Sequence, residues 1–126
     1  MQENVRVVYL YRDATNYKSW AEVVFRSEAG WTPEKAAEEI RCVCDMGNLF
    51  VARQVRLPVL YDTIDGTITA DDHSFHEFHS AEATNEPVTD LLGRSIGELV
   101  GQFLLAAGRG WQPYDLAEAS WDGLGG

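Results

Sequence analysis

The sequence has 126 residues, of which 45% are hydrophobic and 24% are charged, so wholesale disorder is excluded. Twenty acidic residues against ten basic ones give a net charge of −10, and residues 57–126 carry all of it. This negative charge repels phosphate backbones, which argues against nucleic-acid binding. It favours a basic protein partner or a cation.

Two strands and then a helix are predicted in the first third of the chain. Residues 5–12 and 20–26 are rich in β-branched and aromatic side chains, and a polar segment with turn formers joins them into a hairpin. Alternation places four side chains on one face of the first strand: Val5, Val7, Tyr9 and Tyr11.

The helix is predicted from its first residues. Thr32 is a good N-cap, Pro33 suits the first helical position, and Gly47 is expected to end the helix. Its expected buried stripe is Ala36, Ala37, Ile40, Val43 and Cys44.

Four further strands are predicted downstream. Residues 49–56 are expected to form one of them. In residues 59–70, Asp65-Gly66 lies between two alternating runs, which is typical of a type I′ hairpin. The segment "SFHEFHSAEAT" (74–84) is expected to be the last strand.

A second helix is predicted near the end of the chain. Ser95 and Glu98 form a capping box, and Gly108 is expected to end the helix. Its expected apolar face consists of Ile96, Leu99, Val100, Phe103, Leu104 and Ala107.

The order of strand, strand, helix, four strands and helix predicts one α+β domain over residues 1–126. We expect a mainly antiparallel sheet of five to six strands with two helices, and a loosely ordered tail from about residue 109. No long apolar run or secretory segment occurs, which favours a cytoplasmic protein without membrane contact. Cys42 and Cys44, on different faces of the first helix, are expected to be small core residues.

The stretch "DDHSFHEFHS" (71–80) contains all three histidines of the chain. As a strand it sends His73 and His79 to one face and His76 to the other, whereas a metal needs three or four converging ligands. The set that could share a zinc, manganese or iron ion is Asp71, Asp72, His73, Glu77 and His79. The alternatives are acid/base chemistry or a polar strand with hydrogen-bonded or solvated histidines.

The loop of the first hairpin is a second candidate site. Its donors and aromatic groups gather at one end of the sheet, where they could contact a ligand or partner: Arg12, Asp13, Asn16, Tyr17 and Lys18. The alternative is a polar loop with an Arg–Asp contact.

The segments "YRDATNYK" (11–18) and "DDHSFHEF" (71–78) resemble those of a group of small bacterial proteins of unknown function. The resemblance implies a single bacterial domain, and it assigns no role to any residue.

Glycines point to contacts of the last helix and of the C-terminus. Gly97 and Gly101 each cost about 1 kcal/mol against alanine inside a helix, so they predict the close approach of another backbone, from the sheet or from a second subunit. The chain ends in "GLGG", which with the strand–strand–helix–strand order resembles ubiquitin-like modifiers; flexible terminal glycines are the alternative.

These observations favour a small acidic cytoplasmic binding or accessory protein without enzymatic activity. The expected partner is a protein with a basic surface, and a homodimer is a further possibility. No cofactor is expected. The alternative functions are a metal-dependent hydrolase that uses the segment 71–79, including His76, and a ubiquitin-like modifier.

Overall fold

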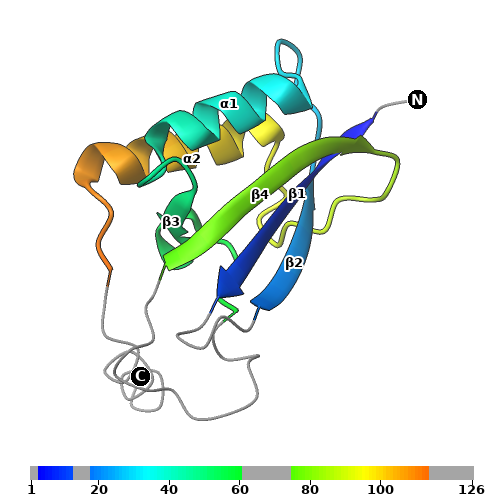
Figure 1. Cartoon of the computed structure of the whole chain (residues 1–126). Coiled ribbons are helices and arrows are strands. Elements are labelled where there is room, and N and C mark those ends of the chain that lie inside the picture. The colour runs from blue at the N-terminus through cyan, green and yellow to red at the C-terminus, as the bar shows by residue number, and fades with distance from the viewer. Residues whose placement is uncertain (1–2, 13–17, 61–74, 114–126) are drawn as a thin grey trace.

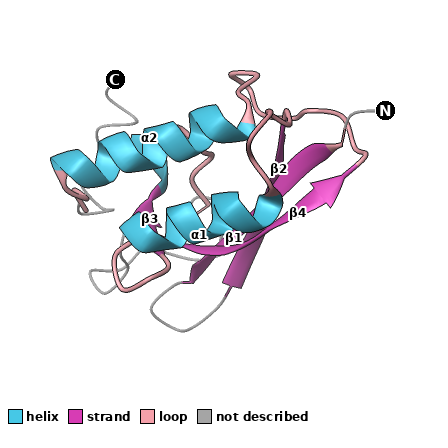
Figure 2. Cartoon of the chain, turned by 90° about the horizontal axis from the view of Figure 1, so that it is seen from above, coloured by secondary structure: helices cyan, strands magenta, loops and turns pink. Residues whose placement is uncertain are grey.

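The computed structural model describes residues 3–12, 18–60 and 75–113. In chain order its elements are β1 (Asn4–Arg12), β2 (Lys18–Phe25), α1 (Pro33–Val43), β3 (Leu49–Val51), the short 3-10 helix η1 (Ala52–Val55), β4 (Phe75–Thr84) and α2 (Ile96–Arg109). The strands form one curled antiparallel sheet in the order β2-β1-β4-β3, and both helices cover the same face of it (Figures 1 and 2).

The predicted α+β class is confirmed, whereas the expected five to six strands and their order are not. Within the described ranges the sheet has four strands. The hairpin expected at Asp65-Gly66 lies outside the described residues.

The central strand β1 supplies much of the core. Val5, Val7, Tyr9 and Tyr11 are all buried in the core, as their alternation predicts. Each such side chain contributes about 1.5–3 kcal/mol when it leaves water. The Tyr9 hydroxyl is satisfied because it donates to the Pro58 carbonyl at 2.7 Å, and burial raises the pKa of this phenol above its ordinary value.

The first helix begins where the sequence indicates. The Lys35 N–H donates to Thr32 Oγ1 at 3.0 Å, which caps the helix. Cys44 is buried at the C-cap, but Cys42 is exposed, so the prediction that both are core residues is wrong for Cys42. Two residues advance a helix by about 200°, which turns Cys42 to solvent.

The strand predicted over residues 49–56 is too long. It ends at Val51 and continues as η1, after which Arg56 takes a left-handed conformation with φ of 57°. The Leu57 N–H donates to the Ala52 carbonyl at 3.0 Å, which closes this turn. Val51 and Ala52 are both buried, so the alternation of a strand is broken there, and Arg94 donates to the carbonyls of Val55 and Arg56 in the turn that follows.

The second helix has the predicted capping box of Ser95 and Glu98. Its buried residues are Ile96, Leu99, Val100, Phe103 and Ala106. The expected burial of Leu104 is wrong, because that side chain is 45% exposed and the buried stripe passes to Ala106 instead. The helix also runs one residue past Gly108, to Arg109.

Neither of the two described helices combines the length and the apolar character needed to cross a bilayer.

Candidate functional site

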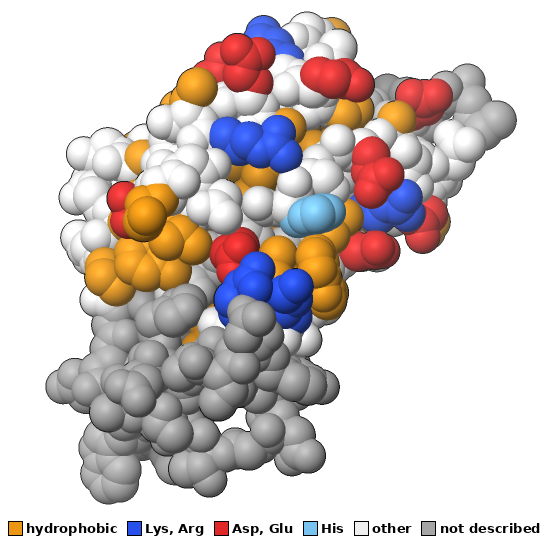
Figure 3. All heavy atoms as spheres, in the orientation of Figure 1, with side chains coloured by type: hydrophobic (Ala, Val, Ile, Leu, Met, Phe, Trp, Pro, Cys, Tyr) orange, Lys and Arg blue, Asp and Glu red, His pale blue; other side chains and the backbone are white. Residues whose placement is uncertain are grey.

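The two described histidines of β4 point to opposite faces of the sheet, as alternation predicts. His76 is fully buried, its Nε2 accepts from the Leu60 N–H at 2.9 Å, and aromatic rings surround it. His79 is exposed and lies edge-on to Trp20, with ring centroids 5.1 Å apart. Figure 3 shows the surface histidine beside hydrophobic side chains, with Lys and Arg side chains on two sides. His76 is thus part of the packing of the core.

The predicted metal ligands are only partly described. Asp71, Asp72 and His73 lie outside the described residues. Glu77 accepts from Arg12 Nε at 2.8 Å, so its charge is paired. Across the three described ranges, no cluster of three or more His, Cys, Asp or Glu side chains is arranged to hold a metal ion.

The predicted loop surface is described only at its two ends. Arg12 and Lys18 are register partners at the ends of β1 and β2. Asp13, Asn16 and Tyr17 lie outside the described residues. The Arg12 guanidinium contacts Glu77 on the neighbouring strand β4. At least one residue of the predicted loop surface therefore stabilises the sheet.

The two helix glycines differ in their surroundings. A Cβ at Gly97 would lie 2.7 Å from Trp31 Nε1, and it would also collide with the Glu28 carboxylate. Around Gly101 the described residues leave open space within 4 Å. Gly97 therefore admits two side chains to the first turn of α2, and the nearest atoms to it belong to side chains rather than to a backbone.

A tight turn before α2 forms a surface that the sequence reasoning missed. The Gly93 N–H donates to the Asp90 carbonyl at 2.9 Å, which places Leu91 and Leu92 at the two corners of the turn. Their exposed fractions are 94% and 54%. Full burial of a leucine contributes about 2 kcal/mol, so this turn leaves a considerable stabilising contribution unused.

Hydrogen bonds to β2 hold the start of this turn. The Thr89 and Asp90 N–H groups donate to the Val24 carbonyl at 3.0 and 3.1 Å. In return the Val24 N–H donates to Thr89 Oγ1 at 2.8 Å. The chain before the leucines is therefore fixed to the edge of the sheet.

A buried ion pair holds the end of the turn. Arg94 Nε and the Arg94 backbone N–H both donate to Asp90 Oδ2, at 3.0 and 2.9 Å. Arg94 Nη1 and Nη2 reach the carbonyls of Val55 and Arg56 at 2.7 and 2.9 Å, which ties the turn to η1. Burial alone would raise the pKa of Asp90, but the hydrogen bonds from Arg94 outweigh it and lower that pKa below its ordinary value.

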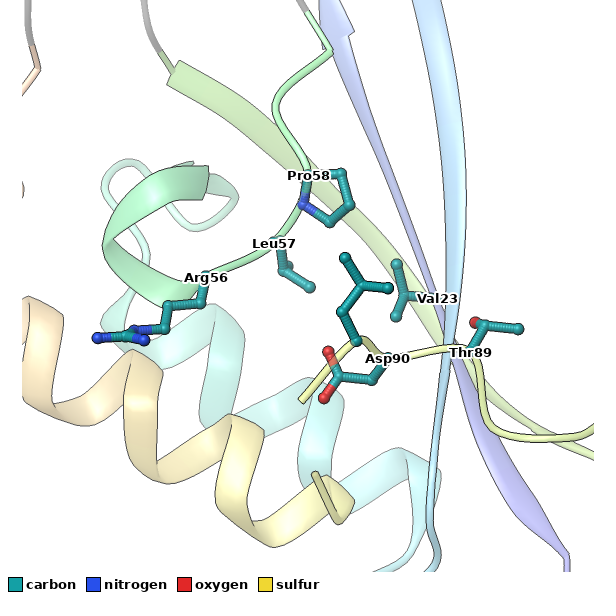
Figure 4. Close-up of a pocket in the computed structure, with 7 residues that line it drawn as sticks. Val23, Arg56, Leu57, Pro58, Thr89 and Asp90 are labelled. Carbon is teal, nitrogen blue, oxygen red and sulfur yellow. The ribbon is translucent and has the colours of Figure 1, made fainter. Parts of the chain in front are cut away.

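An apolar cavity of about 290 Å³ lies beside the turn. Figure 4 shows Val23, Leu57 and Pro58 around it, while the Arg56 side chain extends away from it. Thr89 and Asp90 line one side with groups that already have partners. The walls from Val23, Leu57 and Pro58 are apolar, and the charged end of Arg56 points away from the cavity. The cavity therefore suits an apolar side chain rather than a polar substrate.

A local signal for the turn exists in "TDLLGRS" (89–95), where two leucines stand between the turn formers Asp90 and Gly93. The cavity itself has no local signal, because its walls come from β2, from the segment after η1 and from the turn.

Searches against protein families, curated proteins and solved structures found no match. The resemblance to small bacterial proteins therefore stays a prediction.

Proposed function

We propose that this chain is a non-catalytic protein-binding domain that receives an apolar side chain of a protein partner in the cavity beside Leu91 and Leu92. The observation that carries the proposal is the position of Leu91. This side chain is 94% exposed at the rim of an apolar cavity, although the backbone on both sides of it is held by hydrogen bonds.

The rigidity of the turn supports a binding role. A surface that is ordered before binding loses less conformational entropy when a partner arrives. Exposed apolar patches that are rimmed by polar residues mark interaction sites on protein surfaces. Here Thr89 and Asp90 at the rim are already paired with Val24 and Arg94.

The ionisable groups nearest the core also support a non-catalytic role. Asp90 pairs with Arg94, Glu77 pairs with Arg12, and His76 accepts from the Leu60 N–H. Each of these contacts joins segments that are distant along the chain or braces the turn, so these groups serve the structure.

The partner is expected to carry a basic surface. The net charge of the chain is −10, which speeds encounter with a positively charged protein. Added salt should therefore slow association more than it changes dissociation.

Site-specific photo-crosslinking in the host cell tests the proposal. A benzophenone side chain at Leu91 should form adducts with one protein, whereas the same group at Met46, which is 85% exposed on another turn, should not form them. Binding of the purified partner should then weaken at least about ten-fold in L91S/L92S, a loss of about 1.4 kcal/mol. The control L104S/L105S removes two other exposed leucines and should bind normally. Equal adducts at both positions, or full affinity of L91S/L92S, would refute the proposal.

A further inference from the structure

The outer edge of β2 is covered over only part of its length. The backbone of Val24 bonds to Thr89 and Asp90, and the Arg26 N–H donates to the Arg94 carbonyl at 3.1 Å. In an antiparallel pair the backbone groups of alternate residues face outward, so Lys18, Trp20 and Glu22 share the orientation of Val24. Among the described residues, none bonds to the backbone groups of these three, which we call the outer triplet.

One side chain of the outer triplet, that of Trp20, is unusual for an exposed edge. Trp20 is 51% exposed, and the charged side chains of Lys18 and Glu22 stand on either side of it along the same face. Edge strands of monomeric proteins are commonly shortened, covered or guarded by charge. A half-exposed tryptophan is instead typical of an interface, where this residue type is enriched.

The outer triplet is complementary to itself. When two copies run antiparallel with Trp20 opposite Trp20, Lys18 of each copy faces Glu22 of the other. In this register every outward residue exchanges both backbone hydrogen bonds with its opposite, and the two indole rings come within contact distance. The charges attract, and a two-fold axis relates the two halves.

We propose that a second copy of this chain pairs with the outer triplet of β2, antiparallel about a two-fold axis through Trp20, and so joins two sheets into one. An unrelated peptide could also add a strand to this edge. The second copy is favoured because the same sequence supplies the matching tryptophan and both opposite charges. The pairing uses neither the cavity nor the turn that carries Leu91 and Leu92 (the leucine turn), so it does not depend on the proposed function.

Charge reversal tests the register directly. K18E places two acidic side chains opposite each other across the axis, and E22K places two basic ones there. Each single variant should therefore self-associate roughly ten- to a hundred-fold more weakly than the native chain. The double variant K18E/E22K restores opposite charges and should dimerise like the native chain. A mixture of the two single variants should form a heterodimer, because every facing pair is then attractive.

Sedimentation equilibrium of the full chain over a concentration series measures these species, and native mass spectrometry identifies the heterodimer. K35E changes the charge of an exposed residue on α1 and is the control that should leave self-association unchanged. Circular dichroism checks that each variant is folded. A native chain that stays monomeric throughout the series, or single reversals that dimerise as well as the native chain, would overturn the proposal. A double variant that fails to recover would overturn this register.

Discussion

Arg94 holds the Asp90 carboxylate through both of its oxygens, with Nε 3.0 Å from Oδ2 and Nη2 3.0 Å from Oδ1. Both side chains are more than nine-tenths buried. The guanidinium also packs over the Phe25 ring, with Cζ 5.5 Å from the centroid. This pair therefore joins the leucine turn to β2 and, through the carbonyls of Val55 and Arg56, to the end of η1.

Removing one partner of this pair should destabilise the protein strongly. Asp90→Ala leaves a buried guanidinium without its counter-charge, and we expect a loss of about 3–5 kcal/mol in the free energy of unfolding, measured in urea. Arg94→Lys should not preserve the native stability, because one ammonium cannot make the same fork of hydrogen bonds. Glu82→Ala, which breaks an exposed pair with Arg6, is the control and should cost less than about 1 kcal/mol. Equal losses for Asp90→Ala and Glu82→Ala would contradict this prediction.

The same pair should make stability depend on pH. The pKa of Asp90 is lower in the folded chain than its ordinary value of 3.8, so its stabilising contribution is complete above that value and is lost as the pH falls through the folded pKa. The stability difference between the native chain and Asp90→Asn should therefore be constant from pH 7 to about pH 5 and should narrow at more acidic pH. Urea titrations at a series of pH values measure it; a difference that widens on acidification would contradict the assignment.

The two described histidines form a matched pair for mutation. His76→Phe keeps an aromatic ring but leaves the buried Leu60 N–H without its acceptor, so we expect a loss of about 1–3 kcal/mol in stability. His79→Phe changes an exposed ring beside Trp20 and should stay within about 0.5 kcal/mol of the native chain. Thermal and urea unfolding would reveal the contrast. If both variants behaved alike, the buried hydrogen bond would not contribute as described.

The helix glycines provide a second matched pair. Gly101→Ala adds a methyl group in open space and should raise stability by about 1 kcal/mol through helix propensity. Gly97→Ala must displace the Trp31 indole and the Glu28 carboxylate, so it should be less stable than Gly101→Ala by about 1–3 kcal/mol. Melting temperatures of the two variants give the comparison. Equal stabilisation by both substitutions would show that Trp31 moves aside freely.

The cysteines should differ in reactivity. Burial raises the pKa of the Cys44 thiol to about 12, an effect that nearby Arg41 partly offsets, whereas Cys42 is exposed. The thiolate is the reactive form, so Ellman's reagent at mildly alkaline pH should titrate one thiol rapidly in the folded chain and two after denaturation. Cys42→Ser should abolish the rapid phase. A rapid phase of two thiols in the native chain would contradict the burial of Cys44.

Features that depend on neighbouring residues can be predicted from the sequence. The caps at Thr32 and Ser95, the alternation along β1 and the opposite faces of His76 and His79 all follow from contacts within a few residues. The last strand ends at Thr84, as predicted, for the same reason.

Features that depend on distant contacts cannot be predicted in this way. The conversion of a strand into η1 goes with hydrogen bonds from Arg94 to Val55 and Arg56, which no local pattern indicates. Helical spacing assigns Leu104 to the apolar face of α2. The position of the sheet decides which edge of this face is buried, and Leu104 lies on the exposed edge. The cavity likewise requires three segments to meet.

The pairing of β1 with both β2 and β4 has a consequence for synthesis on the ribosome. The hairpin of β1 and β2 is complete early, but β4 begins about 60 residues after β1 ends. Synthesis proceeds at about 5–20 residues per second, so the inner edge of β1 stays unpaired for several seconds before β4 is made. During this time helix α2 is also absent, and the core face of β1 is not covered by it. Because this central contact is so distant along the chain, its formation should limit the folding rate, and chaperones that shield apolar hairpins would act during that interval.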